Sequence, residues 1–199
     1  LLALDTSTEQ LSLALGLWQA NTATPTQLWQ HTGAGAAQSS ATLIPAIQHL
    51  LAQANMALTQ LGAIVFGNGP GSFTGLRTAC SVAQGLALGA NLPVLPINTL
   101  LATAQDWHSR HAPPQTSGSI WALLDARMDE IYAEHWQWHT TGSGTATRTQ
   151  WHCASPACLI KPEQLLQLPG ITPTATCAGN VQAAYSARLP LCVQPAMPT

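Results

Sequence analysis

Two turns carry residue types that could do chemistry. The turn DTST spans residues 5–8 between two apolar segments, and Gly69-Pro70-Gly71 separates an apolar segment from a helical pattern. Ser72 or Thr74 can cap that helix, and the free N–H groups at its start could hold an anion. The second turn is not a P-loop, because no lysine follows its last glycine. On these residues alone, a connector that merely turns the chain is the favoured alternative.

Histidine pairs are the other candidates. His135 and His139 have a spacing that could bind zinc on a helix. The segment alternates like a strand, however, which would place the two residues about 13 Å apart, so we expect no metal. His108 and His111 are interpreted as a solvated helix end. The spacing identifies no Ser/His/Asp or Cys/His arrangement, so a hydrolase cannot be argued.

Composition limits the function further. Only 7% of the 199 residues are charged and the net charge is −2, which gives no basic field for a phosphate backbone. The low content of charged residues also gives weak protection against self-association. The five cysteines are an odd number without a CxxC pair, which favours reduced thiols in a cytoplasm. No apolar run reaches the roughly 20 residues of a membrane span. We interpret the opening residues as a core strand, not a leader, at a trimmed N-terminus.

Hydrophobic periodicity predicts the elements of the first half. We expect a hairpin of strands at 1–5 and 11–17, and a weaker strand at 27–32. A helix should follow from about Ser40 to Ala54, capped by Ser39 or Ser40, with Pro45 near its first turn. The remaining predictions are strands at 62–67 and 93–97, a helix from Phe73 to Ala90, and a helix from Thr99 to about His111.

The second half repeats this order after a linker at 112–118. Strands are predicted at 119–125, 130–138 and 147–153, with a turn at 142–144 before the last of them. A short helix at 162–168, a strand at 174–179 and a helix at 181–188 follow. We therefore predict an α/β fold with two lobes, each ordered as three strands, helix, strand, helix. The lobes span residues 1–111 and 112–199.

The helix after the glycine-rich turn carries a stripe of small residues. Ala79, Ala83 and Ala87 recur one turn apart, with Gly75 a turn earlier. Such a stripe lets a second helix approach closely. The partner helix could be the one near residues 40–54 of the same lobe, or it could belong to another subunit. The residue types leave both alternatives open.

Phosphate-contacting elements are present only in degraded form. In sugar kinases, actin and heat-shock ATPases, a similar N-terminal hairpin carries an Asp and a Gly that meets nucleotide phosphate, and here Ser7 stands in place of that Gly. The second half offers Asp125 without glycine, and the adenosine-side glycine pair is reduced to Gly179. The residues that would correspond to a degenerate nucleotide pocket are Asp5, Thr6, Ser7, Thr8, Gly69, Gly71, Ser72, Asp125 and Gly179.

Three ordered motifs resemble the bacterial TsaB (YeaZ) family. GNGPGSFTGLR and the following AQGLALG and PVLPINTL match its central signature, LLALDTSTEQLSLAL resembles its N-terminal hairpin, and DARMDEIYAEHW resembles a strand pair of its second domain. The match runs in order from residue 1 to about residue 160. The resemblance implies a two-lobed, actin-like (ribonuclease H-like) ATPase fold that has lost catalysis.

The resemblance also implies the partners. Family members act with TsaD, which transfers the threonylcarbamoyl group to adenosine 37 of tRNA, and with the ATPase TsaE. We thus expect a non-catalytic subunit without cofactor or metal, which is cytoplasmic, reaches tRNA only through the complex and can form a homodimer when alone. Pairing in the family uses two helices of the first lobe, and the expected interface residues are Leu43, Ile47, Leu50, Gly75, Ala79, Val82, Ala83 and Ala87.

Two departures from the family pattern stand out. Ser39 replaces a histidine that usually opens the first helix, and the chain ends before a further helix and a Tyr-Leu-Arg-like segment, so the second lobe is expected to be truncated. The alternative function is an active small-molecule kinase or peptidase-like enzyme of the same fold. Ser7 in place of glycine argues against that alternative.

Overall fold

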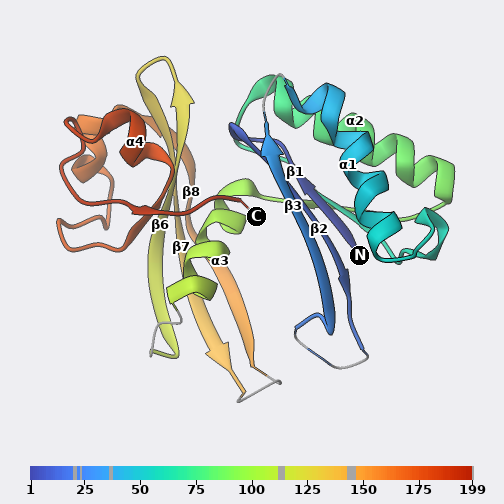
Figure 1. Cartoon of the computed structure of the whole chain (residues 1–199). Coiled ribbons are helices and arrows are strands. Elements are labelled where there is room, and N and C mark those ends of the chain that lie inside the picture. The colour runs from blue at the N-terminus through green and yellow to red at the C-terminus, as the bar shows by residue number, and fades with distance from the viewer. Residues whose placement is uncertain (20–21, 23, 36–37, 112–114, 143–146, 199) are drawn as a thin grey trace. The chain divides into compact units, whose positions relative to one another are not determined.

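A computed structural model describes residues 1–19, 22, 24–35, 38–111, 115–142 and 147–198. The chain divides into two compact units, one formed by Leu1–Thr99 with Pro198, the other by Leu100–Met197. Each unit is built around one five-stranded sheet (Figure 1). No helix of the described residues is long and apolar enough to cross a membrane.

The sheet of unit 1 has the order β3-β2-β1-β4-β5. Its strands are β1 (Leu2–Asp5), β2 (Gln10–Leu17), β3 (Gln27–Ala34), β4 (Ile64–Gly67) and β5 (Val94–Ile97). The first three pair antiparallel, whereas β4 and β5 join parallel to β1. The alternating leucines of β2 place one set of side chains against the helices of the unit.

Helices α1 (Ser39–Gln53) and α2 (Phe73–Ala90) pack on one face of this sheet, and a 3₁₀ turn, η2 (Leu58–Gln60), lies between them in the chain. The side chain of Ser72 caps α2 by accepting a hydrogen bond from the N–H of Gly75, as predicted. The predicted serine cap of α1 is wrong, because Gln38 occupies the cap position and Ser39 is already helical. Pro45 lies inside α1, beyond its first turn.

The sheet of unit 2 has the order β10-β9-β6-β7-β8. Its strands are β6 (Ser117–Arg127), β7 (Glu130–Thr141), β8 (Arg148–Ile160), β9 (Cys177–Gly179) and β10 (Gln194–Pro195). Three further elements complete the unit, namely α3 (Thr99–His111), the 3₁₀ segment η4 (Pro162–Gln167) and α4 (Val181–Tyr185). The β6–β7–β8 part is an antiparallel meander, whereas β9 is parallel to β6.

Helix α3 belongs to the second unit, although we predicted the boundary at residue 111. Its apolar residues Leu100, Ala104 and Trp107 pack with alternate residues of β6 and β7, including Ile120 and Trp136. The burial of these side chains explains why the compact units divide at Thr99/Leu100. The opposite face of the sheet packs in a separate cluster with residues of η4 and α4.

The larger differences from prediction lie in the second half. Strand β8 continues to Ile160 rather than ending at residue 153, and α4 ends at Tyr185 rather than residue 188. Strand β9 begins at Cys177, three residues later than predicted, and the two-residue β10 was not predicted. Parts of the predicted linker (112–114) and of the predicted turn (143–144) lie outside the described residues.

Candidate functional site

The DTST turn and the glycine-rich turn pack directly on each other. The N–H of Ser72 donates to the carbonyl of Ser7 at 2.6 Å, and the hydroxyl of Thr6 donates to the carbonyl of Gly75 at 2.6 Å. All four residues from Asp5 to Thr8 are buried. The chain's own backbone therefore occupies the space beside the start of α2 that we considered for an anion.

Three glycines allow this close approach. An added Cβ at Gly67 would lie 1.8 Å from a carboxylate oxygen of Asp5, and one at Gly75 would lie 1.8 Å from the carbonyl oxygen of Thr6. At Gly71, it would lie 2.6 Å from the carbonyl oxygen of Ser7. These distances are far inside van der Waals contact, so any side chain would push the two turns apart. Packing between the turns is thus a sufficient reason for the glycine-rich sequence.

The carboxyl group of Asp5 is held in a protein environment. Its Oδ1 accepts hydrogen bonds from the N–H of Ser7 at 2.9 Å and from the hydroxyl of Ser7 at 2.6 Å. Burial nevertheless raises the pKa of Asp5 to about 6, because desolvation outweighs the two hydrogen bonds that favour the charged form. Ser7, the residue in place of the expected glycine, is therefore the hydrogen-bond partner of the neighbouring acid.

Gly69 has a structural role in the same loop. Its φ of +104° lies in a region that favours glycine. Its carbonyl accepts from the N–H of Thr99 at 2.9 Å, and the Thr99 hydroxyl donates to the carbonyl of Pro70. The loop is therefore fixed to Thr99 at one end and to the DTST turn at the other, both within unit 1.

Asp125 and Gly179, the other two pocket-like residues, meet in unit 2. Asn180 joins them, since its N–H donates to the carbonyl of Leu123 and its side-chain oxygen accepts from the N–H of Asp125 at 2.8 Å. A Cβ on Gly179 would lie 1.6 Å from that same Leu123 carbonyl oxygen. The carboxylate of Asp125 accepts from the Tyr185 hydroxyl at 2.9 Å and pairs with the Arg127 guanidinium at 3.2 Å. Internal partners therefore engage this carboxylate.

The expected interface residues need a correction. The side chains of α1 and α2 that we assigned to a partner lie in the core of unit 1, where the packing is intramolecular. The buried members are Leu43, Ile47, Leu50, Gly75, Ala79, Ala83 and Ala87, and Val82 packs partly buried against them. Of the two alternatives left open by the sequence, the structure supports packing within the lobe. The reason is that α2 lies against both α1 and the sheet, and these contacts bury its small-residue stripe.

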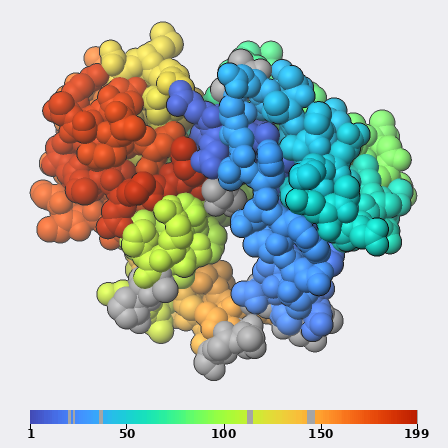
Figure 2. Space-filling model, in the orientation of Figure 1, coloured from blue at the N-terminus to red at the C-terminus, as the bar shows by residue number. Residues whose placement is uncertain are grey.

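The opposite faces of the same two helices reach the surface of unit 1 (Figure 2). Large apolar side chains are exposed there, namely Ile44 at 46%, Phe73 at 68% and Leu88 at 87%. A Cβ at Gly85 or Gly89 would meet no atom within 4 Å. A glycine inside a helix costs about 1 kcal/mol relative to alanine, and a larger residue would fit at either position.

The two histidines considered as zinc ligands lie in a strand. His135 and His139 are in strand β7, as predicted, and His135 stacks on Trp121 with ring centroids 4.6 Å apart. Among the described residues, no three His, Cys, Asp or Glu side chains come together as a metal site. The absence of bound zinc stays a prediction.

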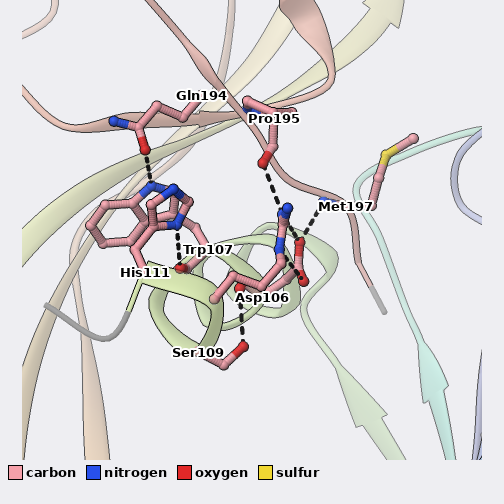
Figure 3. Close-up of polar contacts among 8 residues, drawn as sticks. Asp106, Trp107, Ser109, His111, Gln194, Pro195 and Met197 are labelled. Carbon is pink, nitrogen blue, oxygen red and sulfur yellow. Dashed lines mark hydrogen bonds and ion pairs between the residues drawn. The ribbon is translucent and has the colours of Figure 1, made fainter.

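Sequence reasoning missed a polar network at the end of α3 (Figure 3). His111 is not simply a solvated helix end, because its ring stacks on Trp107, whose indole N–H donates to Gln194 in β10. Asp106 pairs with Arg110 and accepts from the N–H of Met197. The spacing of Asp106 and Arg110, four residues apart on a helix, was the available signal. The network fastens β10 to α3, which is a structural role.

Comparisons with known proteins agree with this geometry. A family model described as TsaD, tRNA N6-adenosine threonylcarbamoyltransferase, matches residues 31–191. The TsaB protein of Haemophilus influenzae is 38% identical over 83% of this chain, and that of Escherichia coli is 35% identical over 82%. The chain spans only 66% and 63% of those two relatives, just under two thirds of their length.

Solved structures give the same result. YeaZ from Pseudomonas aeruginosa superposes with a TM-score of 0.74 at 31% identity, over 98% of this chain and 81% of that one. A second structure from the same organism, described as similar to peptidase YeaZ, has a TM-score of 0.73 at 32% identity, with the same coverage. The predicted two-lobed, actin-like α/β fold is confirmed, and the chain belongs to the TsaB (YeaZ) family.

Proposed function

We propose that this chain is a non-catalytic partner subunit in the biosynthesis of threonylcarbamoyladenosine on tRNA. It would act with a TsaD-like transferase and a TsaE-like ATPase, and would meet tRNA within that complex. The names of its relatives support the pathway. The match to a TsaD family model fits pairing between two subunits of related fold.

The observation that best supports the non-catalytic role is that the DTST turn of unit 1 is packed against the chain's own backbone. In a nucleotide-binding turn, glycine and free N–H groups leave room for phosphate. Here Ser7 bonds to Asp5, its carbonyl accepts from Ser72, and Gly71 sits against it at a distance that leaves no space for another group. Opening this space would require breaking buried hydrogen bonds, each worth about 1 kcal/mol net and more if left unpaired.

The partner surface that we propose is the outward face of α1 and α2. Gly85 and Gly89 lower helix stability without an intramolecular benefit, and Leu88 exposes most of its side chain beside them. Small residues beside an exposed apolar side chain would let a partner helix pack at short distance. Their cost to the free subunit is then offset in the complex.

The test is binding and turnover with matched variants. The pure chain and a TsaD-like subunit should co-elute from a sizing column, and Gly85→Arg should abolish co-elution. Gly62→Arg is the control, because Gly62 also has open space at its Cβ position but lies outside both helices. Co-elution of Gly85→Arg at wild-type affinity would remove the surface assignment.

Turnover decides between the scaffold and the enzyme alternative. The isolated chain should neither hydrolyse ATP nor modify tRNA, whereas the complete complex should do both. Steady ATP or peptide turnover by the pure chain, lost in an Asp5→Asn variant, would favour a kinase or a peptidase instead. The description of one structural neighbour mentions a peptidase, so both substrates belong in the assay.

A further inference from the structure

One end of the sheet in unit 2 presents an open polar face. Strands β6, β7 and β8 pair there in two cross-strand rows of three residues whose side chains alternate onto the same face. All six side chains are exposed. The two rows are Ser119–Gln137–His152 and Ser117–His139–Gln150. They line a hollow of about 660 Å³.

The rest of this face is used by the fold. Trp121, Leu123, Ile131 and Ala133 lie further along β6 and β7 and pack in a cluster with residues of η4 and α4, including Leu165. The elements η4 and α4 thus cover the apolar part of the face and leave the polar rows open. A hollow of this volume lies within the roughly 300–1,000 Å³ of small-molecule sites.

The chemistry of the rows is that of a neutral, hydrogen-bonding surface with a cation at one end. Two hydroxyls, two carboxamides and two imidazoles can each both donate and accept. The next row outward pairs Thr141 with Arg148, an exposed residue that forms no ion pair with the residues the structure describes. The nearby Glu134 is buried, and it accepts from the indole of Trp136, which packs on the α3 side of the sheet. The two rows and the row beyond them therefore carry no carboxylate.

We propose that this face binds single-stranded RNA. Glutamine amides pair in bidentate fashion with adenine edges, and imidazole rings stack on unpaired bases. Arg148 would contact a phosphate at the end of the rows, because a guanidinium matches phosphate oxygens. An apolar protein partner is disfavoured, since the centre of a protein interface needs buried aromatic or aliphatic anchors that these rows lack. Open sheet faces are also a known platform for RNA bases.

The net charge of −2 does not exclude this site. Only the charges beside the rows act strongly on a bound strand, because exposed charges are screened beyond about 8–10 Å in physiological salt. One phosphate contact gives a shallow salt dependence, with a slope of about 0.7 for a single strand. Binding by the isolated chain should therefore be weak, and a complex that already holds the RNA would raise its effective concentration. The inference goes beyond the proposed function by adding direct RNA contact.

The test measures binding of the whole chain to a fluorescein-labelled, adenine-rich RNA by fluorescence anisotropy at low salt. The RNA has about eight nucleotides, a length within the range of single-strand binding sites. Arg148→Gln and Gln137→Glu should each weaken binding by about tenfold, on the scale of one lost specific contact. Lys161→Gln is the matched control, because it removes the same charge from just beyond the other end of β8 and should change affinity less than about twofold. All three positions are exposed, and thermal melting checks that each variant is folded.

Three results would overturn the proposal. These are no binding of the RNA by the wild-type chain, equal losses for Arg148→Gln and Lys161→Gln, and equally tight binding of a duplex of the same sequence. Co-elution with the TsaD-like subunit is measured on the same variants. Failure of wild-type co-elution would refute the proposed function, whereas a wild-type chain that co-elutes but does not bind the RNA would refute only this inference.

Discussion

At the scale of single residues, the buried acid of the DTST turn ties stability to pH. The pKa of Asp5 is about 6 in the folded chain, against an ordinary value of 3.8. Between about pH 4 and 6 the folded state therefore binds more protons than the unfolded state. By linkage, the contribution of Asp5 to stability decreases as pH rises through this window and stays low above it.

Asp5→Asn should remove that pH dependence. The variant keeps an oxygen that can accept from Ser7, and it carries no charge to bury. As the pH rises from 4 to 7, the free energy of unfolding of the variant should increase by on the order of 2–3 kcal/mol relative to that of the wild type. Chemical denaturation at a series of pH values measures the difference. Parallel stability curves for the two proteins would show that the carboxyl is not destabilised by burial.

The hairpin tip between β6 and β7 is a second residue-level feature. Arg127, Met128 and Asp129 all have positive φ, at +66°, +52° and +63°, and Met128 is 92% exposed. Left-handed backbone costs most residues about 1 kcal/mol or more, whereas asparagine tolerates it. Met128→Asn should therefore raise the unfolding free energy by about 0.5–1 kcal/mol. Met128→Val should lower it, and a higher melting temperature for the valine variant would contradict the argument.

At the scale of elements, the small-residue stripe of α2 shows what a pattern can and cannot predict. Both bounds of α2 and of α3 were predicted from periodicity and capping. The same periodicity found the stripe at Ala79, Ala83 and Ala87, yet it could not identify what covers it, because a helix of the same lobe and a helix of a partner need the same small side chains. The structure places α1 and the sheet there.

Ala83→Arg tests that placement. If the stripe were an interface, this change would abolish partner binding and leave the fold intact. Ala83 has no exposed surface within unit 1, so a charged side chain would have to enter the core. We now expect a loss of several kcal/mol and early melting or insolubility. The neighbouring Gly85→Arg, on the exposed face, should melt at or slightly above the wild-type temperature, because it replaces a glycine inside a helix with a better helix former. Equal melting of both variants would restore the interface assignment.

Strands in the second half were harder to predict than helices. The alternation of β8 is weak in hydrophobic residues because half of its side chains are exposed, and Pro156 within it resembles a strand end. The two residues of β10 carry no periodic signal and pair only because β9 is adjacent in space. In physical terms, edge strands depend on their neighbours more than on their own sequence.

At the scale of the whole molecule, the two sheets repeat one plan, a three-stranded antiparallel meander extended by two parallel strands. The order of elements predicted this repeat without any sequence repeat.

The candidate site was only partly predictable. The residues around Asp5 and around Asp125 were found from their resemblance to phosphate turns, but their hydrogen bonds to Ser7 and Tyr185 needed the structure, because those partners come from turns and helices whose packing the spacing does not encode.

The whole chain has little electrostatic protection against self-association. Only 7% of the residues are charged, so repulsion between copies is weak. Leu88 is exposed on the outward face of α2 beside the open glycines, and Phe73 is exposed at the first residue of the same helix. We expect a concentration-dependent homodimer through this face when no partner is present. Because a two-fold interface uses the same patch on both copies, a single change in it acts twice.

Sedimentation velocity over a range of concentrations measures this equilibrium. Gly85→Arg should shift the chain to monomer, whereas Gly62→Arg should leave the dimer unchanged. A TsaD-like subunit added in excess should convert the homodimer to a heterodimer, since both would occupy the same helices. A dimer that persists in Gly85→Arg, or a larger assembly that contains both the homodimer contact and the TsaD-like subunit, would place self-association on a different surface.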